Sequence, residues 1–243
     1  MNLHQGLKYL LCFILGLSVT SQALAATEEN PPLVEVHIPQ DNLAPYKDRR
    51  LDSGIYVAVG YEALLLNKFT SGIDGISYDT VYGSNPIPLV RFNMDYKYNI
   101  ALGSLSAGVE FGYGKNTGDD AGGERSLSVT KYGLDARYAA DMIWDEPYVV
   151  PYVGITVWQM QLDEKTATDT LSESTGFGYN YTVGLMFQLN WIDYATARNA
   201  TFNLGLENTF IDVYLTQYSA SGSAGEPETE TDLIYGANLR FEF

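Results

Sequence analysis

The sequence predicts an all-β fold, an eight-stranded antiparallel up-and-down transmembrane β-barrel. Three observations predict it. Apolar and polar residues alternate with a period of two in eight separate segments, as in strands that bury one face. The links between these segments alternate between long and short. One strand face is aliphatic and aromatic, while the other is rich in Gly, Asn, Ser and charged residues.

Residues 1–25 are predicted to form a secretory signal peptide. A short polar start with Lys8 precedes the apolar run YLLCFILGLSV, and small residues follow at Ala23 and Ala25. A membrane anchor is the less favoured alternative, because a bilayer span needs about 20 apolar residues. Cleavage after Ala25 removes Cys12, the single cysteine, and would leave no thiol or disulfide chemistry in the mature chain.

Residues 26–52 are Pro-rich and charged, which predicts a flexible periplasmic lead-in before a barrel over residues 53–243. Beyond residue 25 the chain has 13 of its 14 basic residues and all 30 acidic ones, so its net charge is 13 minus 30, or −17. This balance argues against a nucleic acid partner and against polybasic binding to anionic lipid head groups.

The first four predicted strands each show their own alternation. In residues 54–65 the apolar positions are the odd numbers, Ile55 to Ala63. In residues 88–98 and 130–139 they are the even numbers, and in residues 104–114 again the odd ones. Long polar links are predicted near 67–85 and 115–125, and a short one lies near Asn99.

The remaining four strands are predicted in the same way. Residues 148–159 and 233–243 alternate apolar and polar positions, and residues 176–190 are the clearest case, with apolar residues at every odd position. The segment TFNLGLEN, residues 201–208, is predicted as the seventh strand. Long links are then expected near 162–175 and 212–231, and short ones at ADMIWDE and WIDYATARN.

The aromatic face is predicted to point outward. A soluble barrel would turn its apolar face inside, but the interior of eight strands is only wide enough to be filled by side chains. Rows such as Phe177, Tyr179 and Tyr181 would crowd that space, whereas small and polar residues fit it. Outside, these rows match lipid, and closure of the sheet satisfies the backbone. A soluble secreted barrel is the alternative.

Long loops on one side and short turns on the other are typical of outer-membrane barrels. From Ser53 to Phe243 the architecture resembles the small eight-stranded bacterial outer-membrane barrels, the group of the OmpA membrane domain, OmpX and the opacity-type proteins. Two departures are the long lead-in and the lack of a peptidoglycan-binding domain after the last strand.

This resemblance implies several expectations. The protein would lie in the outer membrane of a Gram-negative bacterium, in contact with its lipid and lipopolysaccharide. The barrel-assembly machinery would recognise its terminal strand. The residues expected to form this assembly signal are Tyr235, Leu239, Phe241 and Phe243.

The inward face is predicted to carry a network of charges that plugs the lumen, because buried charges are tolerated only when paired. Hairpin geometry predicts the pairs Glu62–Arg91 and Glu110–Lys131. An alternative is an ion gate in which Arg91 or Lys131 exchanges partners. The predicted network comprises Glu62, Arg91, Asp95, Glu110, Lys131, Asp135, Arg137, Glu207 and Arg240.

The surplus acidic residues fall in the predicted loops, at TGDDAGGE, LDEKTATDTLSES and SAGEPETETD. We interpret these loops as a solvated surface. Binding of a divalent cation is the alternative, although no loop has EF-hand spacing. Aromatic residues near strand ends predict interfacial girdles, and they are Tyr98, Tyr113, Trp144, Tyr148, Trp158, Trp191 and Tyr194.

No catalytic, cofactor or metal site is predicted. The two histidines, His4 and His37, both precede the barrel, so a His-dependent site is not expected in it. The sequence therefore predicts a non-enzymatic outer-membrane barrel that serves envelope structure, surface interaction or adhesion, with a possible ligand at its loops. The alternatives are a narrow OmpW-like channel for small or hydrophobic solutes and an outer-membrane enzyme that modifies lipid.

Overall fold

The computed structural model describes residues 43–120, 123–221 and 226–243. The predicted signal peptide and most of the predicted lead-in therefore lie outside the described residues. The helices and strands, in chain order, are α2 (Tyr46–Arg49), β1 (Ser53–Leu64), α3 (Tyr78–Tyr82), β2 (Ile87–Ile100), β3 (Gly103–Asp120), β4 (Gly123–Ala139), β5 (Val149–Lys165), β6 (Thr170–Ser174), β7 (Gly178–Gln188), α4 (Tyr194–Leu204), β8 (Asn208–Tyr218) and β9 (Ile234–Glu242).

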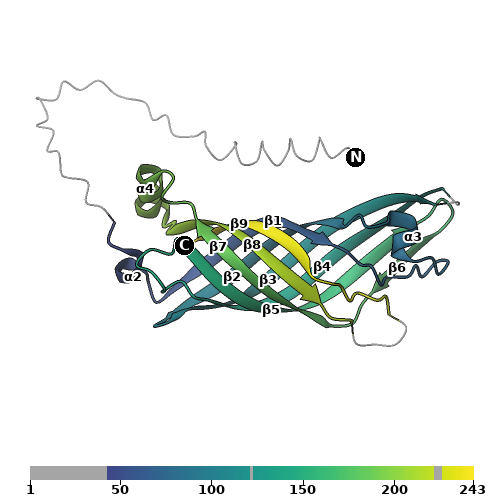
Figure 1. The fold of residues 1–243 in the computed structure, drawn as a ribbon, viewed down its shortest axis with the longest axis horizontal. Helices are drawn as coiled ribbons and strands as arrows, with labels where there is room; N and C mark the ends of the chain where they lie inside the picture. The colour runs from purple at the N-terminus through teal and green to yellow at the C-terminus, as the bar shows by residue number, and fades with distance from the viewer. Residues whose placement is uncertain (1–42, 121–122, 222–225) are drawn as a thin grey trace, which may run out of the picture. The chain divides into compact units, whose positions relative to one another are not determined.

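Eight strands close into an antiparallel up-and-down barrel, as predicted (Figure 1). Each strand pairs with the next one in the ring, and β1 closes it by pairing with β9 as well as β2. The last residue of the chain takes part in this seam, since Phe243 N donates to Ile55 O at 2.9 Å and Ile55 N to Phe243 O at 2.8 Å. Strand β6 pairs only with the far end of β5 and lies outside the ring.

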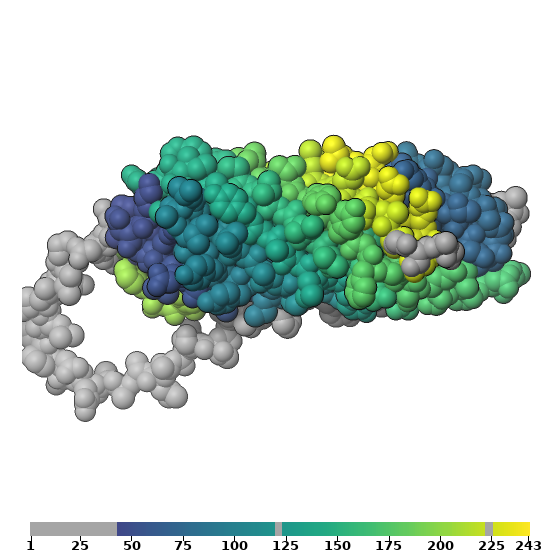
Figure 2. Space-filling view, turned by 90° about the horizontal axis from the view of Figure 1, so that it is seen from below, coloured from purple at the N-terminus to yellow at the C-terminus, as the bar shows by residue number. Residues whose placement is uncertain are grey.

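The two ends of the barrel differ. The turn between β2 and β3, the helices α2 and α4, and the C-terminus gather at one end, which we call the terminus end (Figure 1). Helix α3 and strand β6 lie at the other, the loop end, as Figure 2 also shows for the residues around position 75. The strands are unequal in length: β3 has 18 residues and β4 and β5 have 17 each, while β9 has nine.

The apolar face points outward all around the ring. In β2 the residues from Val90 to Tyr98 alternate, with even positions exposed and odd positions buried. The same holds in β7, where Val183 is 54% exposed and Leu185 is 40% exposed. On the face seen in Figure 2, the surfaces of neighbouring strands meet side by side. The predicted orientation of the two faces is confirmed.

Two apolar clusters fill parts of the interior. The larger one lies toward the loop end, and α3 packs into it through Tyr78 and Tyr82. The smaller one includes Tyr56, Val150, Tyr152, Met186 and Phe210. The charged residues described below lie inside the same barrel.

The prediction for the seventh strand was wrong. Residues 194–204 form helix α4, and the strand begins only at Asn208. The Asp193 side chain caps the helix by accepting from Thr196 N at 3.1 Å, and Gly205 ends it in the left-handed conformation at φ 69°. Residues 208–218, most of which were assigned to a long loop beginning at Asp212, are strand β8. The loop that follows is correspondingly shorter.

Residues 43–52, the last part of the lead-in predicted to be flexible, are folded against the barrel. From Leu43 the chain packs onto the barrel, and the Tyr46 side chain is fully buried. Backbone and side-chain hydrogen bonds hold α2 in place, for example Tyr46 N to Glu146 Oε1 at 2.9 Å. The helix is too short to be stable alone, so its burial in the barrel must fix it.

Most aromatic residues of the predicted girdles are exposed, although Tyr113 lies in the middle of β3 and Tyr194 begins helix α4. The exposed residues are Tyr98, Tyr113, Trp144, Tyr148, Trp191 and Tyr194. Trp158 is the exception. Its side chain is 1% exposed and packs inside the barrel against the Tyr218 ring, with the ring centroids 5.4 Å apart. Among the described residues, the helices are too short or too polar to cross a membrane.

Candidate functional site in the barrel lumen

The lumen holds its buried charges in three layers, and β2 contributes one residue to each. Arg91 belongs to the upper layer, nearest the loop end, Asp95 to the middle layer, and Lys97 to the lower layer, nearest the terminus end. All three side chains point inward because they occupy the odd positions of β2.

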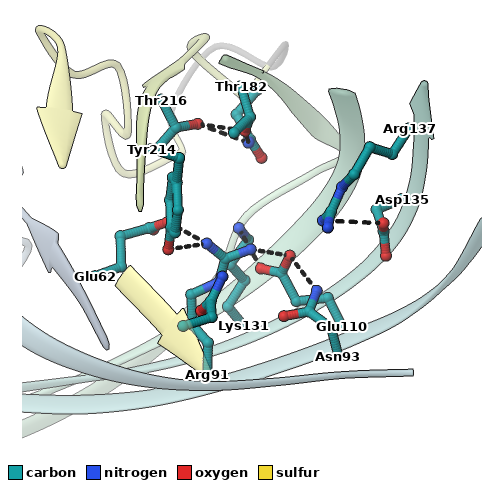
Figure 3. A network of polar contacts seen from close by, with 12 residues as sticks. Glu62, Arg91, Asn93, Glu110, Lys131, Asp135, Arg137, Thr182, Tyr214 and Thr216 are labelled. Atoms are coloured by element: carbon teal, nitrogen blue, oxygen red, sulfur yellow. Dashed lines mark hydrogen bonds and ion pairs between the residues drawn. The ribbon is translucent and has the colours of Figure 1, made fainter. Parts of the chain in front are cut away.

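The upper layer consists of Glu62, Arg91, Glu110 and Lys131 (Figure 3). Arg91 Nη1 lies 2.6 Å from Glu62 Oε2, and the other arm of the same guanidinium pairs with Glu110. Lys131 Nζ lies 2.6 Å from Glu110 Oε1. The structure thus places Glu62 beside Arg91 and Glu110 beside Lys131, and it joins both pairs into one network through Arg91.

Tyrosine hydroxyls complete the upper layer. Tyr218 donates to Glu62 Oε1 at 2.5 Å and Tyr214 donates to Glu62 Oε2 at 3.0 Å. Asn93 Nδ2 donates to Glu110 at 3.1 Å. These donors satisfy carboxylate oxygens that would otherwise be costly to bury. Each acid of this layer therefore has several donors, and exchange of partners would require several bonds to break together.

The middle layer consists of Asp95, Asp135, Arg137, Asp212 and Arg240. Arg240 bridges two carboxylates, at 3.1 Å to Asp95 Oδ2 and at 3.0 Å to Asp212 Oδ2. Tyr152 donates to Asp212 Oδ1 at 2.6 Å. Arg137 and Asp135 are the weakest pair in the lumen, with Arg137 Nη2 3.6 Å from Asp135 Oδ2.

The lower layer consists of Arg50, Lys97, Asp141 and Glu242. Lys97 Nζ lies 2.9 Å from Asp141 Oδ2 and also pairs with Glu242. Arg50 Nη1 lies 3.2 Å from Asp141 Oδ1. Tyr46 of α2 inserts into this layer, and its hydroxyl donates to Glu242 Oε1 at 2.6 Å. The segment before β1 therefore contributes Tyr46 and Arg50 to the lower layer.

Glu207 does not belong to the lumen network, contrary to the prediction. It lies between α4 and β8 at the terminus end, is partly exposed, and pairs with Arg49 of α2. The error follows from the misplaced seventh strand. The prediction put Glu207 on the inward face of a strand, whereas β8 begins only at Asn208. Partial burial raises the pKa of the Glu207 carboxyl, and Arg49 opposes that shift.

Several network residues were missing from the prediction. Lys97 and Glu242 occupy inward positions of correctly predicted strands, so the alternation alone could have identified them. Asp212 was missed because its strand had been assigned to a loop. Tyr46 and Asp141 lie outside the ring strands, and no periodic signal marks them.

At the loop end, the segment between β1 and β2 packs on the larger apolar cluster, and Arg125 holds it there. Phe69 is buried in that cluster. Arg125 of β4 reaches Asp74 Oδ2 at 2.8 Å, Glu164 Oε1 at 2.8 Å and Ser71 Oγ at 3.1 Å. The hydrogen bond from Arg125 lowers the pKa of the Asp74 carboxyl. We call this contact of Arg125 with Asp74 and Ser71 the loop latch.

The acidic loops do not assemble a metal-binding group in the described part of the chain, where no three His, Cys, Asp or Glu side chains lie close enough to hold an ion. Individual loop acids pair with cations or amides instead. Lys68 Nζ lies 2.8 Å from Glu230 Oε2, and Asn67 Nδ2 lies 3.0 Å from Asp232 Oδ2.

The residues of the predicted assembly signal lie on the outward face of β9 and at its end. Tyr235 is 62% exposed and Phe243 is 43% exposed. This placement makes them available to a partner outside the barrel, and their role in assembly stays a prediction.

Little free space remains among the three layers. One small cavity lies beside the middle layer and leaves about 10 Å³ for the centre of a water molecule, which is room for about one water. Its lining includes Arg91, Asp135, Arg137 and Tyr152.

No protein family matches the sequence, and no curated protein matches it either. Among solved structures, the N-terminal β-barrel domain of OprF from Pseudomonas aeruginosa is similar at 15% identity and a TM-score of 0.39, covering 79% of this chain and 98% of that one. Neisserial surface protein A is similar at 12% identity and a TM-score of 0.41, covering 78% and 93%.

A third similar structure is Ail, the attachment invasion locus protein of Yersinia pestis, solved in complex with the heparin analogue sucrose octasulfate. It is 14% identical, with a TM-score of 0.39, and the match covers 79% of this chain and 97% of that one. The fold assigned above rests on the strand pairing and the burial pattern of the chain itself.

Proposed function

We propose that the protein is an outer-membrane barrel of a Gram-negative bacterium, that its lumen is closed, and that it serves envelope structure or surface interaction through its loops. The observation that carries the proposal is the combination of a continuous apolar outer wall with an interior filled by ion pairs. The proposal assigns the protein no catalytic role.

The outer wall supports a location in lipid. Large apolar side chains such as Val109, Leu134, Tyr181 and Val183 are about half exposed or more. In water a belt of this kind would drive aggregation. In a bilayer it matches the hydrocarbon, and the closed ring of antiparallel pairs leaves the spanning strands without a free edge.

The filled lumen supports a structural role over transport. Arg91, Lys97, Lys131 and Arg240 are each held by two or more buried partners, so a solute would have to displace paired charges. Breaking a buried ion pair leaves an uncompensated charge, which costs about 3–5 kcal/mol. A narrow channel is therefore less well supported than a plug.

The loops support a role at the cell surface. They carry acidic residues on exposed segments, while the segment between β1 and β2 is fastened down by the loop latch. An outer-membrane barrel places its longer loops outside the cell. The loop end would then be the face that meets other cells, ions or host molecules.

Location and closure can be tested together in Gram-negative cells that express the full chain. We expect the protein in the detergent-resistant outer-membrane fraction, and we expect the unboiled protein to migrate differently from the boiled one on a denaturing gel. Release into the soluble fraction without detergent would overturn the proposed location.

The closed lumen can be tested by single-channel recording in planar bilayers. We expect no large, stable conductance from the purified barrel. A control variant, Glu62→Ala with Arg91→Ala and Glu110→Ala, removes most of the upper layer and should raise conductance. A stable open pore in the unaltered protein would instead support the channel.

The surface role can be tested with a variant in which Glu226, Glu228, Glu230 and Asp232 become Gln or Asn. We expect the barrel to reach the membrane unchanged and cell adhesion to change. A deletion strain should in parallel become more permeable to detergents if the envelope role is correct. Normal adhesion and normal permeability in both strains would remove the proposed function.

A further inference from the structure

The three lumen layers differ in charge. Among the described residues, the upper layer pairs two acids with two bases, Glu62 and Glu110 with Arg91 and Lys131. The lower layer likewise pairs Asp141 and Glu242 with Arg50 and Lys97. The middle layer has three acids, Asp95, Asp135 and Asp212, for only two bases, Arg137 and Arg240. It therefore has one negative charge too many, in a place where an unpaired charge is costly.

The surplus charge falls on Asp135. Asp212 accepts from Arg240, Tyr152 and Asn238, and one oxygen of Asp95 accepts from Arg240. Asp135 is 5% exposed, yet neither of its oxygens accepts a hydrogen bond from the described residues. Its neighbour Arg137 lies 3.6 Å away, beyond hydrogen-bonding distance. Figure 3 shows this pair set apart from the network around Arg91.

A second free carboxylate oxygen lies beside Asp135. In the strand register, Asp95 of β2 and Asp135 of β4 both pair with Gly108 of β3, one on each side. A Cβ on Gly108 would lie 2.5 Å from Asp95 Oδ1, so this oxygen leans over the glycine. Asp95 Oδ1 is buried and likewise lacks a hydrogen-bond partner among the described residues. Gly108 thus has no side chain to stand between the two aspartates that flank it.

The adjoining cavity contains another buried polar atom without a partner. Asn238 is 5% exposed, lines the same cavity as Asp135, and its Oδ1 accepts no hydrogen bond from the described part of the protein. The cavity has room for about one water. Buried acceptors without hydrogen bonds therefore line a small space together with Arg91 and Arg137, whose Nε and Nη1 atoms respectively also lack a partner among the described residues.

We propose that the middle layer is a proton-binding site, in which Asp95 and Asp135 share one proton across Gly108. The protonated carboxyl donates to the carboxylate, which uses an oxygen of each residue that otherwise has no partner. The added proton neutralises one carboxylate and leaves the layer with two negative and two positive charges, so that it matches the other two layers. Two carboxyl groups that share a buried site generally hold one proton in this way. The inference concerns the interior of the barrel and is independent of the proposed surface role.

Each strand of the ring except β7 places a charged or titratable side chain near Asp95 and Asp135. Strand β7 supplies only the neutral residues Asn180 and Thr182. The charged or titratable groups that face it from its own and neighbouring strands are Tyr56 on β1, Arg91 on β2, Glu110 on β3, Arg137 on β4, Tyr152 on β5, Asp212 and Tyr214 on β8 and Arg240 on β9. Asp212 accepts three hydrogen bonds and Glu110 forms ion pairs with two cations, so neither offers the proton a better acceptor.

Infrared spectroscopy of the refolded full chain in detergent at neutral pH tests the proposal directly. We expect a carboxylic-acid C=O band, shifted in D₂O, with the intensity of one protonated carboxyl per chain. The band should disappear in Asp135→Asn and remain in the control Asp79→Asn, which removes an exposed carboxyl outside the lumen. A spectrum without the band, or a band that survives in Asp135→Asn, would overturn the proposal.

Urea unfolding gives a second readout that does not depend on the spectrum. A folded state that holds an extra proton loses stability as pH rises, because the unfolded chain binds fewer protons there. As the pH rises above the ordinary pKa of an aspartate, we expect the unfolding midpoint to fall more steeply for the unaltered protein than for Asp135→Asn. Asp135→Asn should also be at least as stable as the unaltered protein at pH 9, whereas Asp212→Asn should be less stable.

A small metal cation is the competing occupant of the pair. Titration with Na⁺ or Ca²⁺ under the same conditions separates the two, because a bound cation would raise the unfolding midpoint and suppress the carboxylic-acid band. If a millimolar cation stabilised the protein and the band were absent, the pair would bind the ion in place of the proton, and the proposal would be refuted.

Discussion

The hydroxyl of Tyr46, which precedes the first strand, lies 2.6 Å from the carboxylate of Glu242, the next-to-last residue of the chain. The contact joins residues 196 positions apart and sits in the lower layer beside Lys97. It therefore ties the segment before the barrel to the strand that closes the ring.

Tyr46→Phe should destabilise the barrel, because it removes a buried hydrogen bond to a charged group, worth about 1.5–3 kcal/mol. The measurement is urea unfolding of the refolded barrel in detergent. Tyr98→Phe is the matched control, since Tyr98 lies on the outward face and is 54% exposed. Equal effects of the two substitutions would show that the Tyr46 hydroxyl contributes nothing.

Arg91→Ala should be among the most harmful substitutions in the barrel. It leaves Glu62 and Glu110 buried without their main partner, at a cost of about 3–5 kcal/mol. Lys115→Ala, on an exposed position of β3, should change stability little. The two can be compared by unfolding midpoint, and a similar midpoint for both variants would contradict the upper layer as described.

The loop latch should release in acid. Arg125 lowers the pKa of Asp74, so the latch contributes stability above the ordinary pKa of an aspartate and loses it as the pH falls through the lowered value. The protection of the Ser71 and Gly75 amides from hydrogen exchange, relative to free amides at the same pH, should fall over that range, because both amides are bonded within this loop.

Asp74→Asn should reproduce the acid effect at neutral pH, because the neutral amide cannot pair with Arg125 as a charge. Asp79→Asn, on an exposed position of α3, serves as the control. If the amides of Ser71 and Gly75 still exchanged slowly in Asp74→Asn at neutral pH, the contact of Arg125 with Asp74 would not be what holds this loop.

Residues Val183 and Leu185 should contact acyl chains, while Thr182 between them should not. Spin labels at the first two positions should be accessible to oxygen, which concentrates in lipid. Leu185→Arg should destabilise the barrel in a bilayer by about 2–4 kcal/mol if this position lies near the membrane centre. Labels that report water at both outward positions would show that the protein is not in lipid.

The sequence was informative wherever one face of a strand is exposed to a different medium from the other. Alternation from Val90 to Tyr98 predicted both the existence of β2 and the direction of its side chains. It failed around Phe202 and Leu204, whose spacing of two residues mimics a strand although both lie on the exposed surface of a helix. Asp193, which caps the helix at its start, and Gly205, which ends it, are helix signals in the sequence, and they indicated a helix rather than a strand.

The lumen network was predictable only within strands that had been placed correctly. Glu62, Arg91, Glu110 and Lys131 could be paired from hairpin geometry, because antiparallel neighbours lie at similar heights. The contacts of Tyr46 join segments from opposite ends of the chain. No local pattern encodes such a contact, since it depends on closure of the whole ring.

The unequal strands give the rim of the barrel an uneven height. At about 3.3 Å per residue, the 17 residues of β5 extend roughly 56 Å along their axis, and the nine residues of β9 only about 30 Å. An apolar band about 25 Å tall leaves much of β3 to β5 standing clear of the bilayer. On that side the longer strands form a raised rim. A large particle that arrives from outside would touch this rim first and would reach the shorter seam between β9 and β1 last.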